Sequence, residues 1–209
     1  MYHLPHFKEH DAKLVLEFMK QHPFAMVIGV DEFNQPVATQ IPVLIKEKNG
    51  DLFLQAHIMK QTDHHKAFEH NKNVLVVFSG AHTYVSASLY ENKQQASTWN
   101  YQAVHVKGEL NFLDEAHLLL MLEELTAHFE NNENSPSLYK HLPKEYIDKL
   151  TKAIVAFEIK ITSIENVFKL SQNRDEKSYQ HIMDVFHKGN SDEQYIANEM
   201  SKRKDQLFK

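Results

Sequence analysis

Residues 74–90 read VLVVFSGAHTYVSASLY, and their first part is an almost continuous apolar run. Such a run is typical of a strand that is buried on both faces. From residue 82 onward polar and apolar side chains alternate, which is the period of a strand with one open face. A strand that continues to residue 90 places four side chains on that face: His82, Tyr84, Ser86 and Ser88.

Two further long strands are predicted downstream. Residues 98–113, TWNYQAVHVKGELNFL, place Val104, Val106 and Leu110 on one face. Gly108 interrupts this pattern and predicts a β-bulge. Residues 154–170, IVAFEIKITSIENVFKL, are expected to form a strand pair or one long bent strand.

Upstream, three segments predict an antiparallel meander. They are FAMVIGVD (24–31), PVATQIPVLIKEKNG (36–50) and DLFLQAHIM (51–59). The pair Asn49-Gly50 between the last two is a strong signal for a hairpin turn.

Helices are predicted where apolar residues recur at a helical spacing next to a capping residue. The first covers residues 11–22 with Asp11 as its N-cap, and a short one follows Thr62 or Asp63. The others are expected after Asp114, after Pro143, and as two helices beyond Asp175 that break at residues 188–190.

Six or seven strands without a regular βαβ alternation predict an α+β protein whose antiparallel sheet forms a small barrel with peripheral helices. A dinucleotide-binding fold is excluded, because the chain has no GxGxxG motif and only five glycines.

The composition predicts a soluble, cytoplasmic protein. The chain has no cysteine, no signal-peptide pattern at its start and no run of about 18 apolar residues. Its net charge is −5, which does not support DNA as the main partner. A local contact through Lys202, Arg203 and Lys204 stays open, although these residues are better interpreted as a solvated helix end.

Fifteen histidines raise the question of a metal site. They include His3, His6 and His10 near the start, and a second group at residues 64, 65 and 70. No HExxH motif or other tight set of ligands accompanies them, so we expect no metal. No GxSxG motif is present either, and no catalytic residue can be nominated.

Polar and aromatic residues gather in three places: residues 82–88, residues 99–101 and the segment KLSQNR at 169–174. Polar groups on one face of a barrel strand can orient a planar ligand. The alternative is structural, with Trp99 anchoring the core beside an exposed polar edge. The residues alone leave both open.

Three blocks closely resemble the PaiB family: residues 74–90, residues 97–110 and residues 155–174. The start of the chain, MYHLPHFKEHD, is also similar to that family. The resemblance implies an FMN-binding split barrel over residues 1–174, with residues 175–209 as a helical extension of the same domain. Members of the family are described as negative transcriptional regulators of sporulation and degradative-enzyme genes.

The resemblance further implies a homodimer that holds FMN at the subunit interface. It places the phosphate at a strand-to-helix junction, here residues 55–69, whose helix start offers free N–H groups. Lys60 stands there in place of an arginine. A lysine cannot form the bidentate hydrogen bonds to phosphate that an arginine forms, so we expect weaker FMN binding. The expected cofactor-binding residues are His57, Lys60, Gln61, Thr62, His82, Tyr84, Ser86, Trp99, Asn100, Tyr101, Lys169, Ser171, Gln172 and Arg174.

Two other functions stay open for the same pocket. One is a flavin-dependent oxidoreductase, in which the cofactor supplies the chemistry. The other is a structural partner that has lost its ligand.

Overall fold

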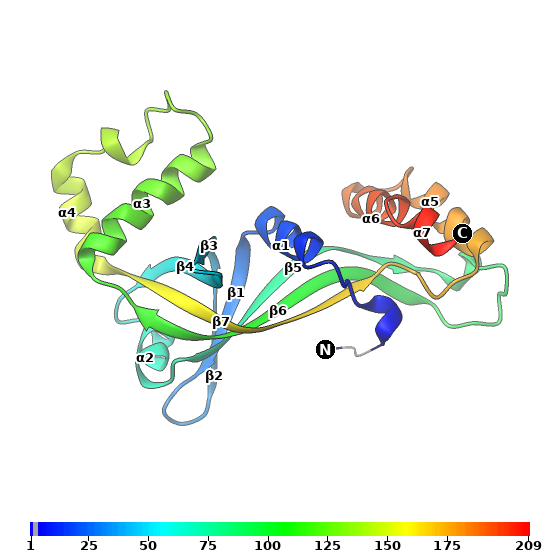
Figure 1. Cartoon of the computed structure of the whole chain (residues 1–209), viewed down its shortest axis with the longest axis horizontal. Coiled ribbons are helices and arrows are strands. Elements are labelled where there is room, and N and C mark those ends of the chain that lie inside the picture. Colours follow the sequence, from blue (N-terminus) through cyan, green and yellow to red (C-terminus); the bar gives the residue numbers. More distant parts are fainter. Residues whose placement is uncertain (2–3) are drawn as a thin grey trace. The chain divides into compact units, whose positions relative to one another are not determined.

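The computed structural model of this chain describes residue 1 and residues 4–209 (Figure 1). Its described part contains a seven-stranded sheet in the order β2-β1-β5-β6-β7-β4-β3. The strands are β1 (Phe24–Val30), β2 (Pro36–Pro42), β3 (Leu44–Lys48), β4 (Asp51–Met59), β5 (Asn73–Val85), β6 (Thr98–Phe112) and β7 (Ile154–Lys169). The helices are α1 (Ala12–Gln21), α2 (Asp63–His70), α3 (Glu115–Glu130), α4 (Lys144–Ala153), α5 (Glu176–Phe186), α6 (Ser191–Ser201) and α7 (Lys204–Leu207).

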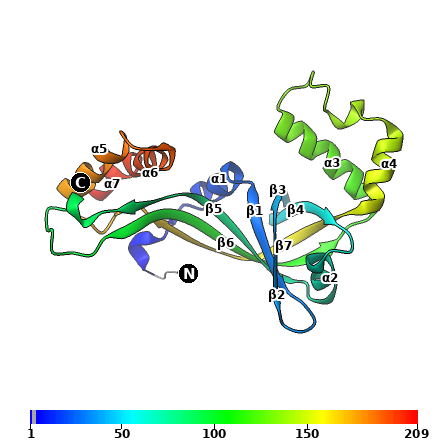
Figure 2. The same ribbon diagram turned by 180° about the vertical axis from the view of Figure 1, so that it is seen from behind.

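The chain divides into two compact units. Unit 1 comprises Met1–His22, Ser79–Val104 and Glu165–Lys209, and unit 2 comprises Pro23–Phe78 and His105–Ile164. The boundaries fall inside β5, β6 and β7, so each of these strands contributes to both units. Unit 1 also contains α1 and the neighbouring C-terminal helices α5, α6 and α7 (Figure 2).

The core of unit 2 forms where β4 pairs antiparallel with β7. Leu54 lies opposite Ile159 and Ala56 opposite Phe157 in this register. All four side chains are fully buried. Paired residues point to the same face of a sheet, so this alternating set forms one continuous apolar layer.

Unit 1 is held together by helices. Asp11 caps α1 by accepting the N–H of Lys13 at 2.8 Å, which satisfies a free donor of the first turn. The apolar stripe of α1 buries Phe18 and Met19. Among the C-terminal helices, the buried hydroxyl of Tyr179 donates to the carbonyl of Met200 at 2.9 Å and ties α5 to α6.

The predicted hairpin at Asn49-Gly50 is confirmed. Lys48 pairs with Asp51, which leaves a two-residue turn between β3 and β4. Asn49 and Gly50 both adopt positive φ, 54° and 85°, as a type I′ turn requires.

The predicted three-stranded meander is wrong. Residues 36–48 form two strands, and β2 pairs with β1 whereas β3 pairs with β4 at the opposite end of the sheet order. The break falls directly after Pro42, which has no N–H for a ladder. The amide of Val43 instead donates to the carbonyl of Pro23 at 2.9 Å.

The prediction of four side chains on one face of residues 82–88 is also wrong in part. β5 ends at Val85, so only His82 and Tyr84 belong to the strand. Ser86 caps the short 3-10 helix Ala87–Leu89, and its hydroxyl is 2.8 Å from that of Ser88. Serine prefers such local bonds to a strand ladder.

No bulge forms at Gly108. Burial alternates without a shift along β6, and Gly108 keeps its place on the buried face. A Cβ at this position would lie 2.4 Å from Cγ2 of Ile159 and 2.5 Å from the carbonyl oxygen of Lys160. The glycine therefore permits a close approach of β7.

Candidate functional site

The predicted cofactor-binding residues fall into two groups. His57, Lys60, Gln61 and Thr62 lie in unit 2, where β4 leads into α2. All the others lie in unit 1, around the ends of β5, β6 and β7.

The junction between β4 and α2 is a sharp turn. Gln61 adopts the left-handed conformation, with φ of 66°. Of the two predicted caps, Thr62 is the N-cap of α2: its Oγ1 accepts the N–H of His65 at 3.3 Å and donates to the carbonyl of Met59 at 3.0 Å. Lys60 is exposed just before the turn. The junction therefore presents a cation beside the start of a helix.

Asp63 changes the electrostatics of this junction. Its carboxylate accepts the backbone N–H of His64 at 2.8 Å, and this bond holds the pKa of Asp63 below its usual value. A carboxylate in this position meets the partial positive charge that a phosphate would use. The acidic residue directly after the cap is the signal by which the sequence could have revealed this competitor.

His57 of β4 lies opposite Ala156 of β7 and is partly buried. Burial lowers the pKa of His57, and its Nδ1 is buried without a hydrogen-bond partner among the described residues. The neutral ring is therefore favoured, and its attraction for phosphate is weak.

In unit 1 three rings form an exposed aromatic cluster. The Trp99 ring lies 6.0 Å from that of His82 and 5.9 Å from that of Tyr84, between ring centroids. Trp99 is 52% exposed and Tyr84 is 51% exposed. Tyr101 follows on the same face of β6 and is partly buried. These rings offer a surface on which a planar ligand can stack.

The segment KLSQNR forms the turn that ends β7. Ser171 has φ of 64°, and its hydroxyl donates to Oδ1 of Asn100 at 3.1 Å. Both residues are at least 98% buried. Gln172 closes the turn with its own side chain, which accepts the N–H of Leu170 at 2.7 Å. Asn100, Ser171 and Gln172 therefore hold this segment in place.

Two cations accompany the turn. The guanidinium of Arg174 stacks on Tyr90 at 3.9 Å and hydrogen-bonds Gln95. Its Nε and the Tyr90 hydroxyl are buried without partners among the described residues. Lys169 hydrogen-bonds Thr98, and burial together with the charge of Arg174 lowers the pKa of Lys169. Donors and positive charge favour an anion here.

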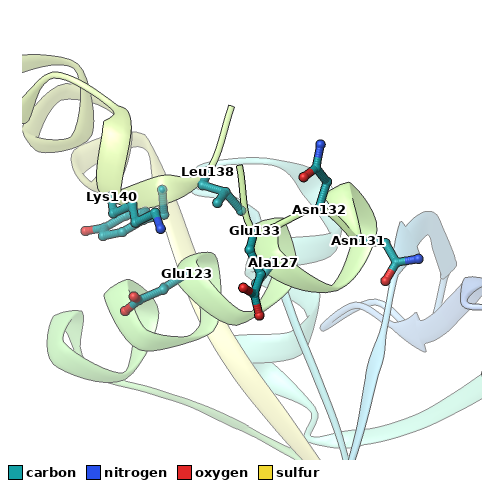
Figure 3. Close-up of a pocket in the computed structure, with 8 residues that line it drawn as sticks. Glu123, Ala127, Asn131, Asn132, Glu133, Leu138 and Lys140 are labelled. Carbon is teal, nitrogen blue, oxygen red and sulfur yellow. The ribbon is translucent and has the colours of Figure 1, made fainter. Parts of the chain in front are cut away.

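A cavity of about 680 Å³ lies beside α3 in unit 2 (Figure 3). Acidic, amide and apolar side chains line it together with one lysine, and none of the predicted cofactor-binding residues is among them. The lining residues are Glu123, Ala127, Asn131, Asn132, Glu133, Leu138, Tyr139 and Lys140.

The basic stretch near the C-terminus runs from the end of α6 into the start of α7, and it is only partly solvated. Lys202 forms an ion pair with Glu199. Arg203 is largely buried and binds both Glu199 and Glu9, at 2.9 and 3.3 Å. Lys204 donates to Gln180 at 2.6 Å. Lys202 and Arg203 are thus paired with carboxylates, and Lys204 is the cation of this stretch whose partner is neutral, which reduces the charge available to phosphates of DNA.

Within residue 1 and residues 4–209, no cluster of three or more His, Cys, Asp or Glu is arranged to hold a metal ion. His3 lies outside the described residues. In the same part of the chain, no helix is long and apolar enough to cross a membrane.

The strand order and the long shared strands define an antiparallel split barrel, the class of fold predicted from the sequence. Solved structures show the same fold at low identity. The flavocytochrome Anf3 from Azotobacter vinelandii has a TM-score of 0.57 and 17% identity, over 80% of this chain and 72% of its own. The FAD and heme binding protein from Mycobacterium smegmatis has a TM-score of 0.55 and 16% identity, over 78% and 73%.

Residues 1–163 match the family described as "Putative FMN-binding domain". The protease synthase and sporulation protein PAI 2 from Bacillus subtilis (strain 168) is 31% identical over 88% of both chains. The chain belongs to this family, and the resemblance noted in its sequence is confirmed.

Proposed function

We propose that this chain is a dimeric, FMN-binding regulator of gene expression in the cytoplasm. Membership of the FMN-binding family and the name of the Bacillus relative, which refers to protease synthesis and sporulation, support this role. We take residues 1–174 as the flavin-binding domain and residues 175–209 as its helical extension. The observation that carries the flavin part is the exposed Lys60 directly before the turn into α2.

The residues of the chain fit the chemistry of the cofactor at two places. In unit 2, Lys60 offers a charge to the phosphate, and Gln61 and Thr62 shape the turn beside it. In unit 1, the rings of His82, Tyr84 and Trp99 offer a stacking surface. The Nε of Arg174, which has no hydrogen-bond partner among the described residues, is the second candidate for the phosphate.

Titration with FMN and riboflavin tests the flavin part. We expect binding of FMN that is tighter than binding of riboflavin, because only FMN carries the phosphate. Isothermal titration of both ligands measures the difference. No binding of either flavin would contradict the proposal, and NADPH-dependent turnover by the FMN-loaded protein would favour the oxidoreductase alternative.

The dimer is proposed from an open apolar face of the sheet. Met26 and Ile28 of β1 pair with Val77 and Leu75 of β5, so all four side chains share the face opposite the core. Phe24 extends this face and is 62% exposed. A second copy of the chain would cover it and remove apolar surface from water.

Light scattering tests the dimer. We expect a dimer at micromolar concentration, and we expect Met26→Lys to shift it toward monomer. Phe33→Lys is the matched control, because Phe33 is exposed in the turn between β1 and β2. A wild-type monomer would contradict the dimer but would leave flavin binding to be judged by titration.

The regulatory role need not involve direct contact with DNA, because Lys202 and Arg203 are both paired with Glu199. We therefore expect weak, salt-sensitive DNA binding that is lost when the residues after Gly189 are removed. A gel-shift assay at physiological salt measures it. Tight, sequence-specific binding by the truncated protein would contradict this expectation.

A further inference from the structure

A cavity of about 350 Å³ in unit 1 lies among α1, α6 and the inner face of the sheet. Phe18 of α1 and Phe168 of β7 line it with aromatic rings, and Gln102 of β6 lines it with an amide. None of these residues belongs to the groups considered above for flavin. The cavity is therefore a separate candidate site.

Gln102 has an unsatisfied acceptor. The residue is 2% exposed, and its Nε2 donates to Oε2 of Glu199 at 3.3 Å. Because the amide nitrogen must face the carboxylate, the other atom is Oε1. Oε1 is buried and has no partner within residue 1 and residues 4–209. A buried acceptor without a donor is unfavourable and points to a missing one.

Glu199 cannot supply a donor to Oε1 of Gln102, because an ionised carboxylate only accepts hydrogen bonds. Its oxygens already receive bonds from Lys202 at 2.5 Å and from Arg203 at 2.9 Å. Burial raises the pKa of Glu199, but these two partners together outweigh burial and bring the pKa below its usual value. Glu199 thus stays ionised, and the missing donor has to come from elsewhere.

The charge of the cavity wall selects the kind of donor. Four carboxylates line the cavity, against two cations, Lys202 and Arg203. The carboxylates of Asp11 and Glu17 belong to exposed residues of its wall. Burial raises the pKa of Tyr195 in the same wall to about 12, so its phenol stays neutral. A cation is attracted to such a wall, whereas an anion is repelled.

We propose that this cavity binds a small organic cation that carries a primary ammonium group. The ammonium donates a hydrogen bond to Oε1 of Gln102, and its charge is balanced by the surrounding carboxylates. The hydrocarbon part packs against Phe18 and Phe168. The volume accommodates a short alkyl chain.

Titration of the full chain with butylammonium, followed by two-dimensional NMR, tests the proposal. We expect saturable shifts of amide signals from β6 and α6. Tetramethylammonium has the same charge but no N–H donor, so we expect it to bind at least tenfold more weakly. Equal binding of the two cations, or no saturable shift with butylammonium, would overturn the proposal.

Two variants separate ligand binding from structure. Gln102→Met keeps the volume but removes the acceptor, and we expect at least a tenfold loss of butylammonium affinity. Glu17→Gln removes a charge from an exposed position of the wall, and we expect a loss of about threefold. Glu32→Gln, an equal change at an exposed residue of unit 2, should have no effect. Unchanged affinity in a folded Gln102→Met protein, or an equal loss in Glu32→Gln, would contradict the proposed site.

Discussion

The turns that follow β4 and β7 share one backbone geometry, but the first is exposed and the second is buried. β4 is followed by Gln61 with φ of 66° and then by the cap of α2, and β7 is followed by Ser171 with φ of 64° and then by the cap of α5. At the first turn the side chains face solvent, and Lys60 remains accessible. At the second the polar groups are buried and bonded to one another. Shared backbone geometry therefore does not indicate shared function: exposure decides which turn can meet a ligand.

The largest effect is expected at the exposed turn. Lys60→Ala should weaken FMN binding about ten- to a hundredfold, because a charge-assisted hydrogen bond contributes about 1.5–3 kcal/mol. Riboflavin lacks the phosphate and should bind as before. Isothermal titration with both flavins measures the contrast.

Lys66→Ala is the matched control, since Lys66 is exposed later in the same helix and should not affect either ligand. If Lys60→Ala leaves FMN binding unchanged while Arg174→Gln weakens it, the phosphate lies at the second turn. The turn after β7 would then be the one that binds the ligand, and the turn after β4 would not.

At the buried turn the expected loss is in stability. Asn100→Ala removes the partner of Ser171 and leaves its hydroxyl buried without a bond, which costs about 1–3 kcal/mol. Thr62→Ala removes only the exposed cap of α2 and should cost about 1 kcal/mol. Urea unfolding measures both values. A larger loss of stability from Thr62→Ala would contradict the structural role given to the buried turn. An Asn100→Ala protein of normal stability with weakened FMN binding would show that Asn100 contacts the ligand.

A smaller effect is expected from Asp63→Asn. The carboxylate of Asp63 occupies the start of α2, and its removal should strengthen FMN binding by a few-fold, up to about fivefold. The effect should shrink at high salt, because the carboxylate of Asp63 and the ammonium of Lys60 are both exposed to solvent. Fluorescence titration with FMN at low and high ionic strength measures it. Weaker FMN binding by Asp63→Asn would show that the carboxylate positions the turn instead of competing with phosphate.

Local signals explain what could be predicted. The Asn49-Gly50 turn and the caps Asp11 and Asp114 each act within a few residues of the chain, and they were predicted correctly. Thr62 was one of two predicted caps for α2. The split of residues 36–48 could not be predicted, because it depends on long-range pairing: β1 pairs with β5 and β4 pairs with β7, which places β2 and β3 at opposite ends of the sheet order.

The same limit applies to the sites. The exposed turn could be nominated from its sequence, because a lysine followed by a helix cap is a local pattern. The environment of Gln102 could not, because it depends on Glu199, 97 residues away in the sequence. The close approach at Gly108 likewise depends on Ile159 and Lys160, so its glycine suggested a bulge instead.

The smallest effect, and the one that separates the turns most directly, comes from placing glycine at each left-handed position. Gln61→Gly relieves an unfavourable conformation and removes no buried contact, so it should stabilise the protein by about 0.5–1 kcal/mol. Ser171→Gly relieves the same conformation but breaks the buried bond to Asn100, so it should destabilise the protein by about 1 kcal/mol. Urea unfolding of both variants under identical conditions measures the sign of each change in the free energy of unfolding. If both substitutions stabilise, the buried bond contributes nothing and the second turn is no more structural than the first; if both destabilise, the side chain of Gln61 makes a contact of its own at the junction.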